Sequence, residues 1–245
     1  MEQIDRSSPL PYYAQVKELL TERIRQGEWE PGEQLPGEPE LCRIYGVSRT
    51  VIRHTLDMLE REGMIVRIKG RGTFVAEPKI SESLVQSLTG FHEDMVRQGY
   101  QPYSKILKQE VVPASVKVAK HLGLEPETPV IELCRLRYIN DIPLALVTTF
   151  LQLAHCPSVL KADLTRRSLY EYLESQCNLK IARGWRFIEA VLANEREAQL
   201  LEIAHGSPLI LLDSVNYLED GTPIEYYHAV HRSDRARFEV HLVRI

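Results

Sequence analysis

The apolar positions between residues 47 and 75 predict a helix that is followed directly by a hairpin. Ser48 is a typical N-cap residue for this helix, and Gly63 is a typical C′ residue about four turns later. Apolar residues recur at helical spacing between these two caps, so one stripe of the helix is expected to face a core. The stripe consists of Ile52, Leu56 and Leu59, with Thr55 beside it.

A hairpin with a cationic tip is predicted after this helix. Residues Ile65–Ile68 and Thr73–Val75 are rich in β-branched side chains, which favour strands. The tip between them, Lys69–Gly72, contains two cations and two glycines. Glycine permits positive φ and a close approach of the backbone to another surface. The tip therefore suits a phosphate backbone or a narrow minor groove.

Two further helices are predicted before residue 47, which makes three helices and a two-stranded wing in total. The first begins near Pro9–Pro11 and ends at Gly27. The second spans Glu38–Tyr45, and Gly46 closes the turn that follows it. The side chains expected to face inward are Val16, Leu19, Leu20 and Ile24 in the first helix, and Leu41 and Ile44 in the second.

The rest of the chain contains one pattern twice. Residues Ala119–Tyr138 and Ala198–Tyr217 each read as the end of a helix, a short loop, a proline and a strand, offset by 79 residues. A second strand follows each time, after Asn140-Asp141 and after Asp220-Gly221, of which Asp-Gly is the stronger hairpin signal. The repeat predicts an α+β domain with a pseudo-two-fold antiparallel sheet and a cleft where the copies meet.

Composition places the chain among ordinary globular proteins. Its 245 residues are 44% hydrophobic and 26% charged, enough for two domains with separate cores. No apolar run of about 18 residues predicts a membrane span, and the N-terminus lacks the apolar region of a secretory signal. Without CxxC spacing, the cysteines are expected to be reduced core residues of a cytoplasmic protein. They are Cys42, Cys134, Cys156 and Cys177.

Charge is distributed unevenly along the chain. The net charge of −4 argues, taken alone, against a nucleic-acid partner. However, residues 1–46 contain five Lys/Arg and nine Asp/Glu, whereas residues 47–76 contain six Lys/Arg and three Asp/Glu. The cationic face is therefore local, and DNA binding through it is expected to depend strongly on salt.

The outward face of the helix after Ser48 is polar and cationic. Arg49, Thr50 and Arg53 lie in its first turn and a half, where a helix in the major groove contacts base edges and phosphates. Exposed arginines are also common on ordinary solvated helices, so the pattern by itself leaves both interpretations open. The candidate DNA-binding residues are Ser48, Arg49, Thr50, Arg53, His54, Lys69, Gly70, Arg71 and Gly72.

The stretch VSRTVIRHTLDMLEREGMIVRIKGRGTFV, with LPGEPELCRIYG before it, resembles the GntR winged helix-turn-helix of bacterial repressors. The resemblance implies binding to a double-stranded DNA operator. Two residues depart from the usual pattern: Gly37 replaces a serine cap, and Pro39 replaces an arginine that commonly contacts DNA. Proline is tolerated in a first helical turn. We therefore expect the second helix to persist without that DNA contact.

Residues 80–245 resemble the UTRA effector domain of chorismate-lyase-like fold, which follows a GntR domain in the histidine-utilisation-repressor (HutC) subfamily. The resemblance is carried by GFHEDMVRQG, RLR, SLYEYL and HRSDRARF. It predicts a winged helix-turn-helix at 1–76, a polar linker at 77–90, and an effector-binding and dimerisation domain at 91–245.

Arg135 and Arg137 are two positions apart in a predicted strand and therefore point to one face. Two guanidinium groups on one side of a cleft suit a phosphate or a carboxylate. The residues alone favour a solvated sheet face or salt bridges to Glu132 and its neighbours. The resemblance favours a ligand site, because in sugar-phosphate-sensing relatives the corresponding arginines line the effector pocket.

The resemblance also supplies the other candidate effector contacts. Three positions differ from the sugar-phosphate-sensing relatives: His92 replaces threonine, Val147 replaces glutamate, and His231 replaces tyrosine. Loss of the glutamate removes an acceptor for amine or hydroxyl groups, so we expect an anionic metabolite other than an amino-sugar phosphate. Either histidine is alternatively a packed core residue. The candidates are Phe91, His92, Arg135, Arg137, Ser168, Tyr170, Glu225 and His231.

These features predict a cytoplasmic, homodimeric repressor of a near-palindromic operator, modulated by a sugar phosphate or organic acid. No cofactor or metal is expected, because the chain lacks a glycine-rich nucleotide loop, a nucleophile elbow and HExxH. His228 and His231, three apart in a predicted strand, face opposite sides and make a poor metal pair. The alternatives are a lyase-type enzyme built on the C-terminal domain and a DNA-binding protein that needs no ligand.

Overall fold

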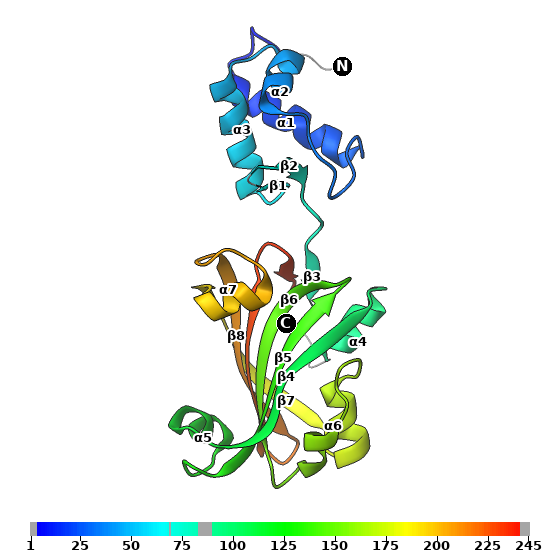
Figure 1. The fold of residues 1–245 in the computed structure, drawn as a ribbon, viewed down its shortest axis with the longest axis vertical. Helices are drawn as coiled ribbons and strands as arrows, with labels where there is room; N and C mark the ends of the chain where they lie inside the picture. The colour runs from blue at the N-terminus through cyan, green and yellow to red at the C-terminus, as the bar shows by residue number, and fades with distance from the viewer. Residues whose placement is uncertain (1–3, 69, 83–89, 241–245) are drawn as a thin grey trace, which may run out of the picture. The chain divides into compact units, whose positions relative to one another are not determined.

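The computed structural model describes residues 4–68, 70–82 and 90–240, and it divides the chain into two compact units, Met1–Pro78 and Lys79–Ile245 (Figure 1). Each unit has its own hydrophobic core. The expected linker contains a strand of the second unit, Ile80–Glu82. Local polarity does not reveal this strand, because its partner lies near the other end of the chain.

The first unit consists of three helices and a two-stranded wing, as the sequence predicts. Ser48 caps α3 by accepting a hydrogen bond from the Val51 amide at 3.4 Å, and Gly63 adopts φ +70° after its last turn. α2 begins at Glu38 with Pro39 in its first turn, so the departures from the family pattern leave this helix in place. The elements are α1 (Tyr12–Arg25), α2 (Glu38–Tyr45), α3 (Arg49–Arg61), β1 (Ile65–Ile68) and β2 (Gly72–Val75).

The three helices bury one continuous core. Val16, Leu20, Leu41 and all three apolar residues of the predicted α3 stripe are at most 1% exposed. The prediction for Ile44 is wrong: its side chain is 43% exposed, and the neighbouring Tyr45 packs against the core instead. Both positions lie one turn after Leu41. The aromatic ring offers more apolar area to bury, and its hydroxyl accepts a hydrogen bond from Arg23 at 2.8 Å.

The second unit is built on a six-stranded antiparallel sheet with the order β4-β5-β6-β9-β8-β7 (Figure 1). The central pair β6–β9 joins two halves of three strands that have the same internal order. The sheet thereby confirms the pseudo-two-fold arrangement that the repeated pattern predicts. Its strands are β4 (Pro102–Pro113), β5 (Pro129–Ile139), β6 (Ile142–Gln152), β7 (Ile181–Leu192), β8 (Pro208–Leu218) and β9 (Pro223–Arg232).

The two predicted hairpin turns of the sheet contain residues that tolerate positive φ. Asn140 and Asp141 both have positive φ, 49° and 62°, which is the requirement of a type I′ turn between β5 and β6. Gly221, with φ +90°, lies in the connection between β8 and β9. Each half of the sheet therefore contains a hairpin, β5–β6 in one and β8–β9 in the other, at a turn that the sequence predicts.

Helices cover both faces of the sheet. Alternation along β5 directs Cys134 and Leu136 toward α7, whereas Ile131 and Leu133 pack with α6 and η1 on the opposite face. None of the helices within the described residues has both the length and the apolar character needed to span a membrane. The elements are α4 (Phe91–Arg97), α5 (Val116–Leu122), η1 (Pro157–Lys161), α6 (Leu169–Cys177) and α7 (Glu195–Leu201).

A second, two-stranded sheet is formed by residues that are distant in sequence. β3 (Ile80–Glu82) pairs in parallel with β10 (Ala236–Phe238). The segment HRSDRARF thus supplies β10 and also the buried Arg232, whose guanidinium donates to the carbonyls of Pro143 and Leu201. Arg232 therefore connects β9 to β6 and α7, and its role is structural.

All four cysteines are free thiols. Cys134 and Cys156 are buried in apolar clusters, while Cys42 and Cys177 are half-buried. They form no disulfide, and the two half-buried cysteines also pack against apolar core clusters.

Candidate nucleic-acid interface and effector pocket

The start of α3 presents an exposed polar and cationic surface on the first unit. Ser48, Arg49 and Thr50 are exposed, and Arg49 has no ion-pair partner within the described residues. Arg53 Nε lies 2.9 Å from Glu38 Oε2, but the arginine side chain remains 66% exposed. An exposed ion pair contributes only about 0–1 kcal/mol. A DNA phosphate can therefore replace Glu38 as the partner of Arg53.

Contacts behind this surface fix the direction of α3. Arg67 of β1 forms an ion pair with Asp57 at 2.7 Å and donates a hydrogen bond to the backbone carbonyl of Arg53 at 3.3 Å. The exposed His54 packs edge-on against the ring of Tyr13, with the ring centroids 4.4 Å apart. Sequence reasoning did not identify Arg67, which holds the wing to the helix that precedes it.

The wing tip approaches another part of its own unit. Gly72 has φ +123°, and a Cβ at this position would overlap with the side-chain amide of Gln34. That amide donates to the carbonyl of Arg71 at 3.0 Å. Gly70 has φ +76° with no atom near its Cβ position, so the tip is open on that side. Lys69, also a candidate, lies outside the described residues.

We expect Gly72→Ala to destabilise the first unit by about 1–3 kcal/mol, because its positive φ is strained for a residue with a Cβ and because the Gln34 side chain must move aside and give up its hydrogen bond to the Arg71 carbonyl. Urea unfolding of the full chain measures this loss of stability from the midpoint of the first unit's transition. Gly70→Asn is the matched control, since asparagine tolerates the left-handed region and meets no neighbour there. Equal stability of the two variants would contradict the role assigned to Gly72.

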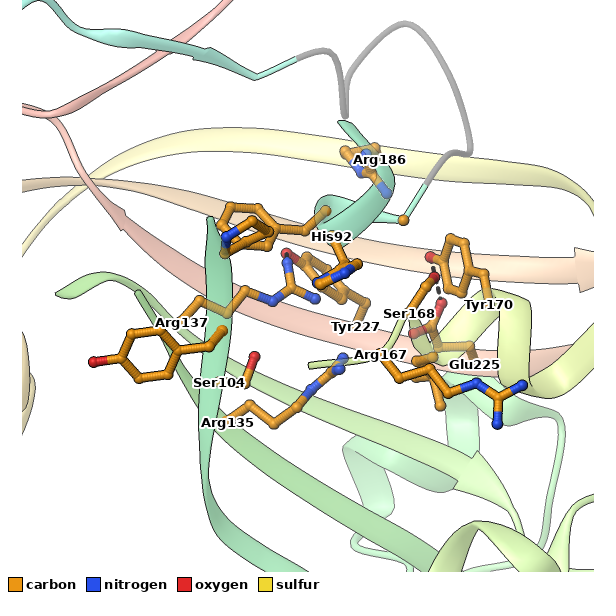
Figure 2. Close-up of a pocket in the computed structure, with 15 residues that line it drawn as sticks. His92, Ser104, Arg135, Arg137, Arg167, Ser168, Tyr170, Arg186, Glu225 and Tyr227 are labelled. Carbon is orange, nitrogen blue, oxygen red and sulfur yellow. Dashed lines mark hydrogen bonds between the residues drawn. The ribbon is translucent and has the colours of Figure 1, made fainter. Parts of the chain in front are cut away.

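The second unit contains a pocket on one face of the sheet, between α4, the N-terminus of α6 and strands of both halves (Figure 2). Its volume is about 30 Å³, room for a water molecule or two. A metabolite therefore enters only when the lining side chains move apart. Seven of the eight candidate effector residues line it: Phe91, His92, Arg135, Arg137, Ser168, Tyr170 and Glu225.

Arg135 and Arg137 form the cationic floor of this pocket (Figure 2). They are 4% and 6% exposed, and neither forms a salt bridge within the described residues. The Arg137 guanidinium lies 4.7 Å from the Phe91 ring centroid, and Arg135 Nε has no hydrogen-bond partner. The arginines are thus neither solvated nor paired with Glu132, which binds Lys108 at 3.2 Å.

Burial, with repulsion from Arg137, lowers the pKa of Arg135 to about 9. The guanidinium is therefore still protonated at neutral pH, although its charged form is disfavoured. An anion placed between the two arginines relieves this cost and completes their hydrogen bonds. The arrangement is that of an anion site.

Glu225 is the acidic residue among those that line the pocket, and two neighbours hold its carboxylate. Tyr170 Oη donates to Glu225 Oε2 at 2.8 Å, and Asn216 Nδ2 donates to the same oxygen at 2.5 Å. Burial and the neighbouring Glu225 charge raise the pKa of Tyr170 well above its ordinary value, so the phenol stays protonated. The pocket therefore offers a fixed acceptor opposite the arginine pair.

The remaining candidates occupy different environments. His92 is half-buried, and burial lowers its pKa, which favours the neutral imidazole. Ser168 caps α6 by accepting from the Glu171 amide at 3.3 Å, and its hydroxyl packs directly under Gly90. His231 does not line the pocket: it is fully buried, with Nδ1 2.8 Å from Glu82 Oε1.

Tyr227 and Arg186 also line the pocket, and neither was among the candidates from the sequence. Tyr227 follows Glu225 by two positions in β9, so alternation places both on the pocket face and was a usable signal. Arg186 comes from β7, and its Nε donates to Ser214 Oγ on β8 at 2.7 Å. Nothing local marks Arg186, because only the pairing of β7 with β8 brings it to the pocket.

Known proteins match both units. Residues 12–75 match the family of bacterial regulatory proteins called gntR, and residues 97–237 match the UTRA domain. The chain is 34% identical to the HTH-type transcriptional repressor NagR of Bacillus subtilis (strain 168) over 99% of both proteins. It is 30% identical to the histidine utilization repressor of Pseudomonas putida, over 94% of this chain and 92% of that protein.

A solved structure agrees with these matches. PhnF from Mycobacterium smegmatis superposes with a TM-score of 0.67 at 28% identity, covering 93% of this chain and 99% of that one. The matched repressors are DNA-binding proteins and not enzymes, which excludes the lyase alternative. The chain therefore belongs to the GntR family of bacterial regulators, in the HutC subfamily with a UTRA domain, and is a DNA-binding transcription repressor.

Proposed function

We propose that this repressor binds a near-palindromic operator as a homodimer and that a small anionic metabolite in the UTRA pocket changes its operator affinity. The observation that carries the proposal is the buried Arg135–Arg137 pair, neither member of which forms a salt bridge within the described residues. A sugar phosphate or an organic acid supplies the missing charge. Operator DNA lies in the bacterial cytoplasm, so the repressor acts there.

The proposed DNA contacts come from the start of α3 and the wing tip. Arg49 and Arg53 bind bases and phosphates, and Thr50 adds a hydroxyl contact. Exposure of all three side chains supports these roles. The tip from Lys69 to Gly72 reaches the minor groove, where Arg71 is the exposed cation among its described residues.

The edge strand β7 supports a homodimer of the second unit. Trp185, Phe187 and Leu192 are 65%, 64% and 71% exposed on a strand at the end of the sheet order. An unpaired edge with large apolar side chains is a surface that a second copy covers. A two-fold dimer presents two DNA-binding units to two half-sites.

Phe187→Glu is expected to give a monomer in analytical ultracentrifugation and to weaken operator binding by at least about tenfold, because one DNA-binding unit then holds one half-site. Val96→Glu is the control, since Val96 is 51% exposed on α4, which packs on β4 at the opposite end of the sheet order from β7. A dimeric Phe187→Glu protein would remove β7 from the interface.

The proposal as a whole is tested by operator gel-shift titrations of the full chain with phosphorylated sugars and small dicarboxylates. One of these anions is expected to change operator affinity by about 10- to 100-fold, equivalent to about 1.4–2.8 kcal/mol of coupling. Neutral sugars of the same size are expected to have no effect. If every anion leaves operator affinity unchanged, the proposal of an effector-controlled repressor fails.

A further inference from the structure

Glu82 and His231 form a fully buried pair at the beginning of the second unit. Both side chains are 0% exposed, and His231 Nδ1 lies 2.8 Å from Glu82 Oε1. Glu82 belongs to β3, four residues after Pro78, where the first unit ends. Burial of two ionisable groups costs free energy. The pair therefore calls for a role beyond packing.

Polar contacts connect this pair to the pocket through Tyr227. The Tyr227 hydroxyl lies 3.5 Å from His231 Nε2 and 3.5 Å from Arg137 Nη1. One donor order satisfies the whole series: Arg137 donates to Tyr227, Tyr227 to His231, and His231 through Nδ1–H to Glu82. The first two of these three contacts, Arg137–Tyr227 and Tyr227–His231, are long at 3.5 Å, so a small displacement of Arg137 is enough to break its contact with Tyr227 and to weaken the next one.

The charges at the two ends of this series both act on Tyr227. Burial raises the pKa of the Tyr227 hydroxyl, while Arg137 acts to lower it and Glu82 acts to raise it. The hydroxyl thus lies within the electrostatic reach of the pocket arginine and of the β3 carboxylate. In a water-poor interior such contacts strengthen one another, and loss of one weakens the rest.

We propose that Tyr227, His231 and Glu82 couple occupancy of the effector pocket to the attachment of β3, an inference that rests on the proposed function. An anion attracts Arg137 through charge-assisted hydrogen bonds, which are stronger than its contact with Tyr227. Tyr227 then loses its donor, and His231 holds Glu82 less firmly. The Glu82 side chain has no other hydrogen-bond partner in the described residues, since its Oε2 is buried without one.

The attachment of β3 matters because this strand is the first element of the second unit and directly follows the first unit in the chain. It is held to β10 by a parallel ladder of three residue pairs, and the Ile80 amide donates to the Arg235 carbonyl at 2.7 Å. So short a ladder is sensitive to loss of the Glu82 anchor. Release of β3 lengthens the free connection to the DNA-binding unit and thereby changes how two such units fit an operator.

Hydrogen exchange of the full-length protein tests the coupling without any ligand. Tyr227→Phe removes only the hydroxyl, and we expect the amides of residues 80–82 to exchange at least about fivefold faster, although Tyr227 belongs to β9. Tyr226→Phe is the matched control. It removes a hydroxyl from the adjacent residue, which packs with α5 on the other face of the sheet, and should leave residues 80–82 unchanged. Equal exchange in the two variants overturns the proposal.

A second experiment with inorganic phosphate distinguishes failure of the coupling from failure of the anion site. At constant ionic strength phosphate should accelerate exchange at residues 80–82 in the wild type and not in Glu82→Gln, which keeps the shape of the side chain but not its charge. If calorimetry detects phosphate binding that depends on Arg135 while exchange in β3 stays constant, the coupling is refuted and the pocket stands. If phosphate does not bind but Tyr227→Phe accelerates β3 exchange, the anion site fails and the coupling stands.

Discussion

Replacing Arg53 by alanine is expected to weaken operator binding by about 1–3 kcal/mol, or roughly 5- to 150-fold in Kd. The variant loses a cation at the exposed start of α3. It also leaves Glu38 without its partner, so that an uncompensated carboxylate faces the DNA backbone. Both effects act in the same direction, which places the expected loss toward the upper end of this range.

Gel-shift titrations at several salt concentrations measure this loss. The slope of log K against log salt should become shallower by about one for the missing phosphate contact. Arg25→Ala is the control, because Arg25 is also exposed but lies at the end of α1. Glu38→Gln should bind the operator more tightly than wild type, since it frees Arg53. If Arg53→Ala and Arg25→Ala bind alike, α3 does not contact DNA through this residue.

Replacing Arg135 by methionine is expected to abolish the effector response while leaving effector-free operator binding intact. Methionine keeps most of the volume and removes the buried charge, which forms no salt bridge within the described residues. The 10- to 100-fold change in operator affinity should then fall to less than about twofold. Arg183→Met, an exposed arginine on β7 away from the pocket lining, serves as the control. A variant that still responds to effector would refute the pocket.

The same substitution is expected to leave the protein as stable as wild type, or more stable. The folded-state pKa of Arg135, about 9, lies well below its ordinary value, so the charged form is penalised in the folded state. That penalty is fully present below pH 9 and is lost as the pH rises from about 9 toward the ordinary arginine pKa. At pH 7 the methionine variant removes all of it, apart from the lost packing. Urea unfolding at pH 7 measures the difference.

Anion binding should follow the protonation of Arg135. Sulfate, whose charge is constant above pH 6, is expected to bind the wild type with an affinity that falls as the pH rises through about 9. The Arg135→Met variant should show no such decline between pH 7 and pH 10. Calorimetric titrations across this range measure both proteins, and an identical pH profile would show that Arg135 does not hold the anion.

Periodicity and cap chemistry determined the secondary structure and the direction of the important side chains. Ser48 and Gly63 delimit α3 because capping depends on neighbouring residues. Arg135 and Arg137 share a face because side chains alternate along any strand. The repeated pattern even predicted the two halves of the sheet, since each half is built around a local hairpin.

Only the tertiary structure decided which distant residues meet. Glu82 reaches His231 across 149 positions, and Arg186 reaches the pocket because β7 pairs with β8. Ile44 and Tyr45 were equally placed one turn after Leu41, and packing against the other helices chose the tyrosine. A sequence pattern reports which side of its own element a residue occupies. Which residues pack against that side depends on the order of strands in the sheet and on which side chains compete for the same buried volume. No short stretch of sequence specifies either of these.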